Sequence, residues 1–289
     1  MGKRRSHNRT NVRVALSGAG LIRLGFAVLN HLPPLAAAAA ERLFFTPPRA
    51  KRKAVAGAQL QRLRAAGGLE LAAWSWGEGP AVLLLHGWGG SSAQLAGLAP
   101  SLVARGFRVV ALDAPGHGLS GGRMSSIPEF ARAAFEAARR LGPFHGVVGH
   151  SLGGAALALA LRDGLEARRA VFIGTPGNPV EWTRRFAHTL GVGERALAGM
   201  KARSERRLGF RWEELDVVSF APRMTVPLLA IHDADDREVP LAEGEAIAKA
   251  WPGASFVATH GLGHSRILRD AEVASRVAAF VAGASFVEG

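Results

Sequence analysis

Short apolar runs alternate with amphipathic segments along most of the chain. Strands are predicted from runs of four or five mainly apolar residues at 81–85, 108–112, 144–148, 170–173, 227–231 and 255–258, and from weak alternation at 69–74. Runs with little polar alternation are typical of parallel strands that are covered on both faces.

Helical spacing of apolar positions fills the intervals between these strands. The predicted helices span residues 92–105, 127–141, 152–162, 241–251 and 270–281. Ser126 and Glu129 have the spacing of a capping box at the start of the second helix. Regular strand–helix alternation predicts the α/β fold class, with a doubly wound and mostly parallel sheet.

Two regions depart from this alternation. About 50 residues separate the strands at 170–173 and 227–231, too many for an ordinary loop. Helical patterns within that interval predict a small helical cap over residues 177–222, between two core segments at 65–176 and 223–289. Residues 1–64 are predicted to be an N-terminal arm, with helical pieces at 21–32 and 35–45 that Pro33-Pro34 separate.

The positive charge of the chain is concentrated in this arm. The net charge is +13, and residues 1–64 contain 13 Lys or Arg and one acid, Glu41. Such an arm can contact an anionic membrane or an acidic partner, and the alternative is a solvated, partly disordered arm. Its two helical pieces are expected either to pack on the body, which is the more common outcome, or to lie on a membrane surface. Nucleic-acid binding is not expected, because the basic residues belong to no recognisable reading motif.

The arm has no apolar run of the ~18 residues that a membrane-spanning helix requires. The chain also contains no Cys and no Tyr. The lack of cysteine excludes disulfides, a thiol nucleophile and cysteine metal ligands, and it fits a reducing compartment. We therefore expect a cytoplasmic protein, with the arm as a candidate for contact with the inner membrane face.

A candidate nucleophile lies in the sequence G-H-S-L-G at residues 149–153. This motif follows the strand at 144–148 and opens the helix at 152–162. A sharp strand–turn–helix connection, the nucleophile elbow, exposes the Ser151 hydroxyl above the carboxyl end of its strand. The hydroxyl then lies next to a helix N-terminus, which favours developing negative charge.

A serine hydroxyl needs a base, and the base needs an orienting group. His264 follows the last predicted strand and is the candidate base. Asp233, Asp235 and Asp236 follow the strand at 227–231, and the spacing to Val239-Pro240 favours Asp236. The order Ser, Asp, His along the chain suits an α/β-hydrolase.

Residues 69–283 resemble the α/β-hydrolase superfamily, and within it the serine esterases and lipases. Besides G-H-S-L-G, the resemblance rests on four motifs at predicted strand ends: H-G-W-G-G at 86–90, D-A-P-G-H-G-L-S at 113–120, D-R-E-V-P at 236–240 and G-L-G-H at 261–264. The family usually has glycine where Asp233 stands.

The resemblance implies an oxyanion hole formed by the backbone N–H groups of Trp88 and Leu152. Residues expected near the substrate pocket are His86, Gly87, His150 and Trp182. Loop bracing is the alternative role for His86, as it is for His117. No metal or other cofactor is expected.

The predicted function is hydrolysis of a small-molecule carboxylic ester through an acyl-enzyme intermediate. The same three residues would also serve a thioesterase, a lactonase or a hydrolase of carbon–carbon bonds. Haloalkane dehalogenases and epoxide hydrolases of this fold use aspartate at the elbow, so Ser151 argues against both. A non-catalytic protein that binds a membrane surface or a partner remains a third hypothesis.

Overall fold

A computed structural model describes residues 20–48, 54–178 and 180–284, and within it the chain divides into two compact units. Unit 1 consists of Met1–Phe45 and Val180–Trp212, and unit 2 consists of Thr46–Pro179 and Glu213–Gly289. Unit 2 contains the sheet, and unit 1 contains only helices among its described elements.

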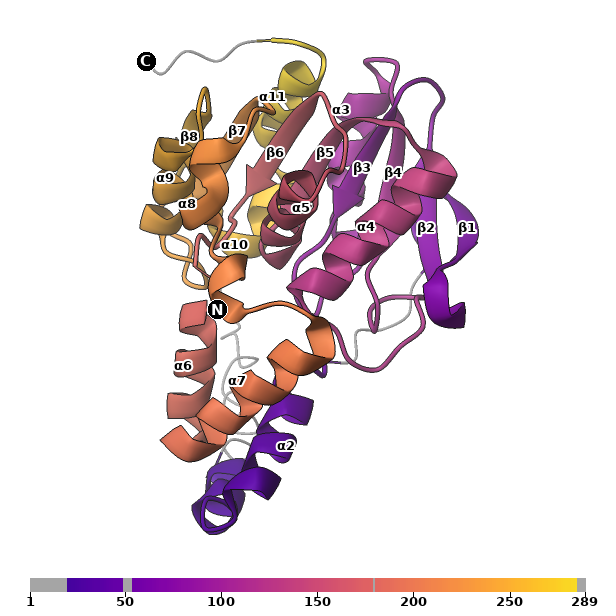
Figure 1. The fold of residues 1–289 in the computed structure, drawn as a ribbon. Helices are drawn as coiled ribbons and strands as arrows, with labels where there is room; N and C mark the ends of the chain where they lie inside the picture. The colour runs from indigo at the N-terminus through magenta and orange to yellow at the C-terminus, as the bar shows by residue number, and fades with distance from the viewer. Residues whose placement is uncertain (1–19, 49–53, 179, 285–289) are drawn as a thin grey trace, which may run out of the picture. The chain divides into compact units, whose positions relative to one another are not determined.

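An eight-stranded sheet forms the centre of unit 2 (Figure 1). Its order is β1-β2-β4-β3-β5-β6-β7-β8, with β1 and β2 antiparallel to their neighbours and every later pairing parallel. The strands are β1 Gln59–Arg64, β2 Glu70–Trp76, β3 Ala81–Leu85, β4 Arg108–Asp113, β5 Phe144–His150, β6 Arg169–Ile173, β7 Leu228–Asp233 and β8 Ser255–Thr259. The predicted α/β class with a mostly parallel sheet is confirmed.

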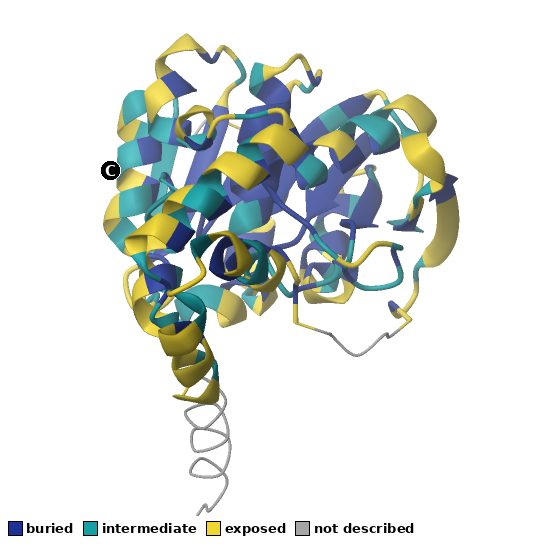
Figure 2. Cartoon of the chain, turned by 60° about the horizontal axis from the view of Figure 1, so that its bottom comes forward, coloured by how far each residue is buried: buried dark blue, intermediate teal, exposed yellow. Residues whose placement is uncertain are grey.

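Helices cover both faces of this sheet. The helices of unit 2 are α3 Ala99–Val103, α4 Ile127–Leu141, α5 Leu152–Arg162, α8 Val217–Phe220, α9 Leu241–Ala250, α10 Gly263–Arg266 and α11 Ala271–Val281. Figure 1 shows α4 and α5 on one face and α3 and α11 on the other. The central strands are buried between these layers, dark blue in Figure 2, which is why their sequences are almost continuously apolar.

The start of α4 has the N-cap half of the predicted capping box. The Ser126 hydroxyl oxygen lies 3.4 Å from the N–H of Glu129, which donates to it, and 2.7 Å from the Glu129 carboxylate. The helix predicted over 92–105 is shorter, because it begins as two 3₁₀ turns and becomes α-helical only at Ala99–Val103. Gly97 lies in this stretch, where a Cβ would be only 2.7 Å from the main-chain oxygen of Leu268.

The division of the chain differs from the one expected from sequence at two places. Residues 59–64, expected within the arm, form the edge strand β1. Five of the six β1 residues are exposed, so the sequence Q-L-Q-R-L-R has no apolar run that would mark a strand. Residues 213–222, expected within the cap, belong to unit 2.

Unit 1 joins the N-terminal segment to the helices expected as a cap. Its elements are a helix over residues 20–29, α2 Pro33–Phe44, α6 Val180–Leu190 and α7 Glu194–Leu208. They share one apolar cluster with Phe26, Ala40, Ala196 and Met200 at its centre.

Polar contacts reinforce this association within unit 1. The buried Glu41 carboxylate accepts hydrogen bonds from Arg203 at 2.9 Å and from Arg207 at 3.0 Å. Asn30 bonds the main chain of the loop between α6 and α7, at Gly191 and Gly193. A buried carboxylate with two guanidinium partners would be costly to separate, so α2 and α7 are held together by charge as well as by packing.

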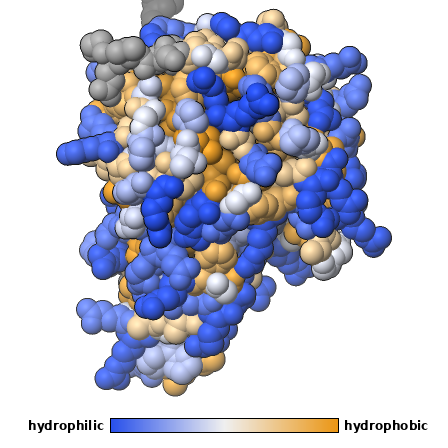
Figure 3. Space-filling model, turned by 45° about the horizontal axis from the view of Figure 1, so that its top comes forward, coloured by the Kyte–Doolittle hydropathy of each residue, from blue (hydrophilic) through white to orange (hydrophobic). Residues whose placement is uncertain are grey.

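The exposed surface carries both hydrophilic and hydrophobic side chains. On the face drawn in Figure 3, hydrophilic residues surround smaller hydrophobic patches. Within the described ranges, no helix combines the length and the apolar character needed to cross a bilayer.

Candidate active site

Ser151 lies in the sharp turn between β5 and α5. Its φ is 52° and its ψ −127°, and it is the one non-glycine residue with positive φ in the described part of the chain. A Cβ at Gly149 would overlap the backbone of Gly154, and one at Gly153 would overlap main-chain oxygens at the end of β3. The glycines therefore allow the close approach that this strained turn needs.

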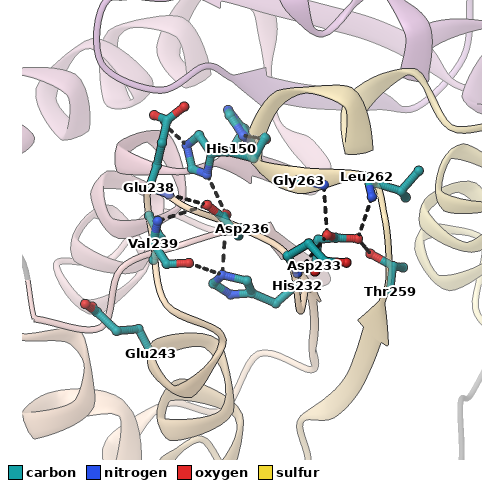
Figure 4. Close-up of polar contacts among 12 residues, drawn as sticks. His150, His232, Asp233, Asp236, Glu238, Val239, Glu243, Thr259, Leu262 and Gly263 are labelled. Carbon is teal, nitrogen blue, oxygen red and sulfur yellow. Dashed lines mark hydrogen bonds and ion pairs between the residues drawn. The ribbon is translucent and has the colours of Figure 1, made fainter.

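Asp236 and His264 are joined by a hydrogen bond. The Nδ1 atom of His264 lies 2.7 Å from Oδ2 of Asp236, whose side chain is only 1% exposed. The other carboxylate oxygen accepts the N–H groups of Glu238 at 2.8 Å and Val239 at 3.0 Å (Figure 4). Because all these bonds favour the ionised carboxylate, Asp236 is suited to hold the imidazole in one orientation.

The hydrogen bonds also determine the ionisation of Asp236. Burial by itself would raise the pKa of this carboxyl. Hydrogen bonds from His232, His264 and two backbone N–H groups outweigh burial and hold the pKa well below its usual range. The group stays ionised at neutral pH.

Asp233 organises the loop that carries the imidazole. Its carboxylate accepts the N–H groups of Asp235, Leu262 and Gly263 and the hydroxyl of Thr259, at 2.8–3.1 Å (Figure 4). Burial would raise the pKa of Asp233, but these bonds lower it overall. The carboxylate that stands where the family usually has glycine therefore ties the loop after β8 to the end of β7.

His232 is a second histidine beside Asp236. Its Nε2 atom donates to the main-chain oxygen of Val239 at 3.0 Å and lies 3.5 Å from Oδ2 of Asp236. Its Nδ1 atom is buried, with no hydrogen-bond partner among the described residues, and faces Gly244 of α9, where a Cβ would overlap it. Sequence reasoning missed His232, because a histidine inside an apolar strand carries no motif that marks its role.

His150 contacts the candidate base from the elbow side. Its Nε2 atom donates to the main-chain oxygen of His264 at 2.8 Å, and the two ring centroids are 4.6 Å apart. Burial, together with the nearby His264, lowers the pKa of His150 to about 3. A neutral ring with its proton on Nε2 leaves Nδ1 unprotonated, and this buried atom has no partner in the described part of the molecule.

The end of β6 contacts both the Ser151 turn and the Asp236–His264 pair. The N–H of Ser151 donates to the main-chain oxygen of Ile173 at 2.8 Å. A Cβ on the next residue, Gly174, would lie 3.4 Å from both Oδ2 of Asp236 and Nδ1 of His264. The Ser151 hydroxyl makes no hydrogen bond to the His264 ring within the described ranges, a common situation in sites without substrate.

His86 and His117 bond the backbone of the loops around them. Nδ1 of His86 donates to the oxygen of Gly87 at 2.7 Å, and its Nε2 accepts from Ala114 at 3.1 Å. His117 accepts from Gly89 at 3.1 Å. Desolvation on burial lowers both pKa values, that of His117 to about 4. Both side chains thus brace loops as neutral rings, and for His86 this is the alternative to a pocket role.

The loop after β3 lies directly against Ser151. A Cβ on Gly87 would be 2.8 Å from the Cβ of Ser151, so only glycine allows this approach. The next residue is Trp88, whose ring packs edge-on against His117 at 5.3 Å. Within the described ranges, neither the N–H of Trp88 nor that of Leu152 donates to a protein acceptor. Leu152 follows the serine directly, and Trp88 follows Gly87, which lies against the serine; the assignment of these two N–H groups to an oxyanion hole stays a prediction.

Trp182, the other residue expected near the pocket, lies on α6 in unit 1. The Arg185 guanidinium lies 5.7 Å from its ring centroid. Its assignment to the pocket stays a prediction, as does the expectation that no metal or cofactor takes part.

Three comparisons relate this architecture to known proteins. A family model described as alpha/beta hydrolase fold matches residues 80–190. A pimeloyl-[acyl-carrier protein] methyl ester esterase from Methylococcus capsulatus is 41% identical over 103 residues, which cover 35% of this chain and 39% of that protein. A human serine hydrolase-like protein is 35% identical over 91 residues, which cover 29% of this chain and 44% of that protein. The chain therefore matches about two-fifths of the length of these curated relatives.

A solved structure extends the likeness over most of the chain. The esterase Pf2001 from Pyrococcus furiosus superposes with a TM-score of 0.63 at 21% identity, covering 82% of this chain and 98% of that one. At that identity the likeness shows the fold. Together with the family model over residues 80–190 and the local sequence matches, it shows that the chain has the α/β-hydrolase fold, and it supports membership of that superfamily. The resemblance inferred from the sequence motifs is confirmed.

Proposed function

We propose that the protein is a serine hydrolase that cleaves a carboxylic ester through an acyl-enzyme intermediate. Ser151 is the nucleophile, His264 the general base and Asp236 the orienting acid. The observation that carries the proposal is the 2.7 Å hydrogen bond between Asp236 and His264. Ser151, in its strained turn, lies at the same carboxyl end of the parallel strands.

In the first half of the reaction, Ser151 Oγ attacks the ester carbonyl while Nε2 of His264 takes the hydroxyl proton. The tetrahedral intermediate collapses, the bond to the alkoxy oxygen breaks, and His264 gives its proton to the leaving alcohol. Asp236 stabilises the imidazolium that forms between these two transfers, and its depressed pKa keeps it ionised throughout.

In the second half, His264 removes a proton from water, which attacks the acyl carbonyl. The bond to Ser151 Oγ breaks, the serine recovers its proton from His264, and the carboxylic acid leaves. The N–H groups of Trp88 and Leu152 hold the negatively charged oxygen in both tetrahedral intermediates, each donor contributing about 3–4 kcal/mol.

A small-molecule ester is the proposed substrate, since both the Methylococcus relative and the Pyrococcus structure are named as esterases. Thioesters, lactones and carbon–carbon bonds suit the same three residues, so a substrate panel should include one of each. The lack of cysteine is compatible with a reducing compartment, so the cytoplasm remains the proposed location.

The proposal is tested with Ser151→Ala against Ser219→Ala, a matched control in which an exposed serine of unit 2 is removed. We expect Ser151→Ala to lower kcat/KM for short p-nitrophenyl esters by roughly 10⁴-fold or more. Labelling by a fluorophosphonate probe should disappear from Ser151→Ala and persist in Ser219→Ala. Undiminished turnover or labelling in Ser151→Ala would exclude Ser151 as the nucleophile.

A further inference from the structure

The helix over residues 20–29 has two apolar sides. One side, with Phe26 at 3% exposure and Ile22 and Leu29 partly buried, packs into the apolar cluster of unit 1. The other side carries Leu21, Leu24 and Val28, which are 72%, 67% and 68% exposed. Positions i, i+3 and i+7 lie on one face of a helix, so these three side chains form a single outward stripe, the apolar face.

Exposed apolar side chains are concentrated around this stripe. Seven large apolar residues of the described chain are exposed, and six of them lie between residues 21 and 43. They are Leu21, Leu24, Val28, Leu32, Leu35 and Leu43, and the seventh is Leu60 on β1. A helix that is apolar on nearly every side is normally covered, so the apolar face is expected to have an occupant.

The same unit carries nearly all the net charge of the protein. Unit 1 contains 15 Lys or Arg and four Asp or Glu, which is +11 out of a total of +13. Unit 2 is close to neutral. Both parts of unit 1 contribute to this charge: residues 1–45 carry +6, and residues 180–212, with the arginines of α6 and α7, carry +5.

We propose that unit 1 docks on an anionic lipid surface through the apolar face. Leucine and valine side chains gain free energy by entering the boundary between headgroups and acyl chains, and basic residues near the surface are attracted to anionic headgroups. The two effects occur in one unit of this protein. A second copy of the chain is a poorer occupant, because pairing would bring two units of +11 together.

Docking of this kind is peripheral, in line with the lack of a spanning helix among the described residues. Since the 20–29 helix shares a core with α6 and α7, these two helices would be carried to the lipid surface with it. The inference does not depend on the proposed chemistry at Ser151.

The test is co-sedimentation of the full chain with vesicles of phosphatidylcholine alone or with about 30 mol% phosphatidylglycerol, across a salt series. We expect binding to the anionic vesicles that weakens as salt rises, and much weaker binding to phosphatidylcholine. No binding to anionic vesicles at low salt would overturn the proposal.

The double variant Leu24→Gln/Val28→Gln tests the apolar face itself. We expect its partition coefficient onto anionic vesicles to fall roughly tenfold for each side chain that no longer enters the lipid. The control Leu60→Gln removes an exposed leucine of unit 2 and should bind like the wild type. Thermal melting and turnover of a soluble ester should be unchanged in both variants, which separates this test from that of the proposed function.

Two results would contradict lipid docking through this face. One is wild-type binding by the folded double variant. The other is a concentration-dependent dimer, seen by analytical ultracentrifugation, that the double variant abolishes while neither protein binds vesicles. The second result would assign the apolar face to a contact between copies of the chain.

Discussion

His150 donates a hydrogen bond from Nε2 to the main-chain oxygen of His264, and the two rings lie 4.6 Å apart. The residue before the candidate nucleophile thus holds the loop that carries the candidate base. It links β5 to the turn after β8, two segments more than 100 residues apart in the chain.

This contact predicts a positioning role for His150. His150→Phe keeps a ring but loses the donor, and we expect kcat to fall by about tenfold with little change in KM, because the His264 loop is less well held. His150→Gln retains a side-chain N–H and should recover part of the loss. Equal activity of the Phe variant and the wild type would exclude this role.

The lowered pKa of His150 also predicts a pH dependence of stability. An unfolded histidine takes up a proton near pH 6.5, whereas the folded one resists protonation until about pH 3. Between these values the unfolded state binds more protons, so the free energy of unfolding falls as the pH falls.

Urea titrations at pH 7 and pH 5 measure this effect. Replacing His150 by Phe should reduce the loss of stability between these two pH values by about 2 kcal/mol. The comparison cancels any pH-independent cost of the substitution. An unchanged difference between the two pH values would show that His150 is protonated equally in both states.

Asp236→Asn tests the orienting carboxylate. The amide cannot stabilise an imidazolium and favours a different ring tautomer, so kcat should fall by roughly 10³–10⁴-fold while the fold is retained. Glu238→Gln is the matched control, since that carboxylate is 63% exposed and lies 3.8 Å from Nε2 of His264. We expect a change of less than about threefold from the control. Similar losses in both variants would contradict a special role for Asp236.

Asp233→Ala tests whether the Asp233 carboxylate holds the His264 loop against the end of β7. Four donors lose a buried acceptor, and the free energy of unfolding should drop by at least about 3 kcal/mol. Asp235→Ala removes a single bond to Gly261 in an exposed setting and should cost about 1 kcal/mol or less. Chemical denaturation of both variants measures the difference in the free energy of unfolding. Equal losses in the two variants would refute the role of Asp233 in holding the loop.

Patterns along the chain predicted much of the fold. Every strand expected from an apolar run is present, because a strand covered on both faces must be apolar at successive positions. The edge strand β1 escaped prediction for the opposite reason: at the border of the sheet most of its side chains face solvent. The close approach of Gly97 to the main chain of Leu268 also has no local sequence pattern that would predict it.

The candidate site was predictable only in outline. The elbow motif and the order of Ser151, Asp236 and His264 are visible in the sequence. The contributions of His232, His150 and Asp233 are not, because each depends on which atoms lie nearby after folding. His232 reads as part of an apolar strand, yet its Nε2 lies beside the Asp236 carboxylate.

By itself, the sequence determined the fold class, the order of the candidate site motifs and the concentration of positive charge toward the N-terminus, because these follow from composition and local pattern. Only the tertiary structure decided which of three neighbouring carboxylates meets the imidazole and which segments share a core. It joined residues 20–45 to α6 and α7 in one unit. The association within unit 1 depends on packing between segments more than 130 residues apart in the chain, which no local sequence pattern predicts.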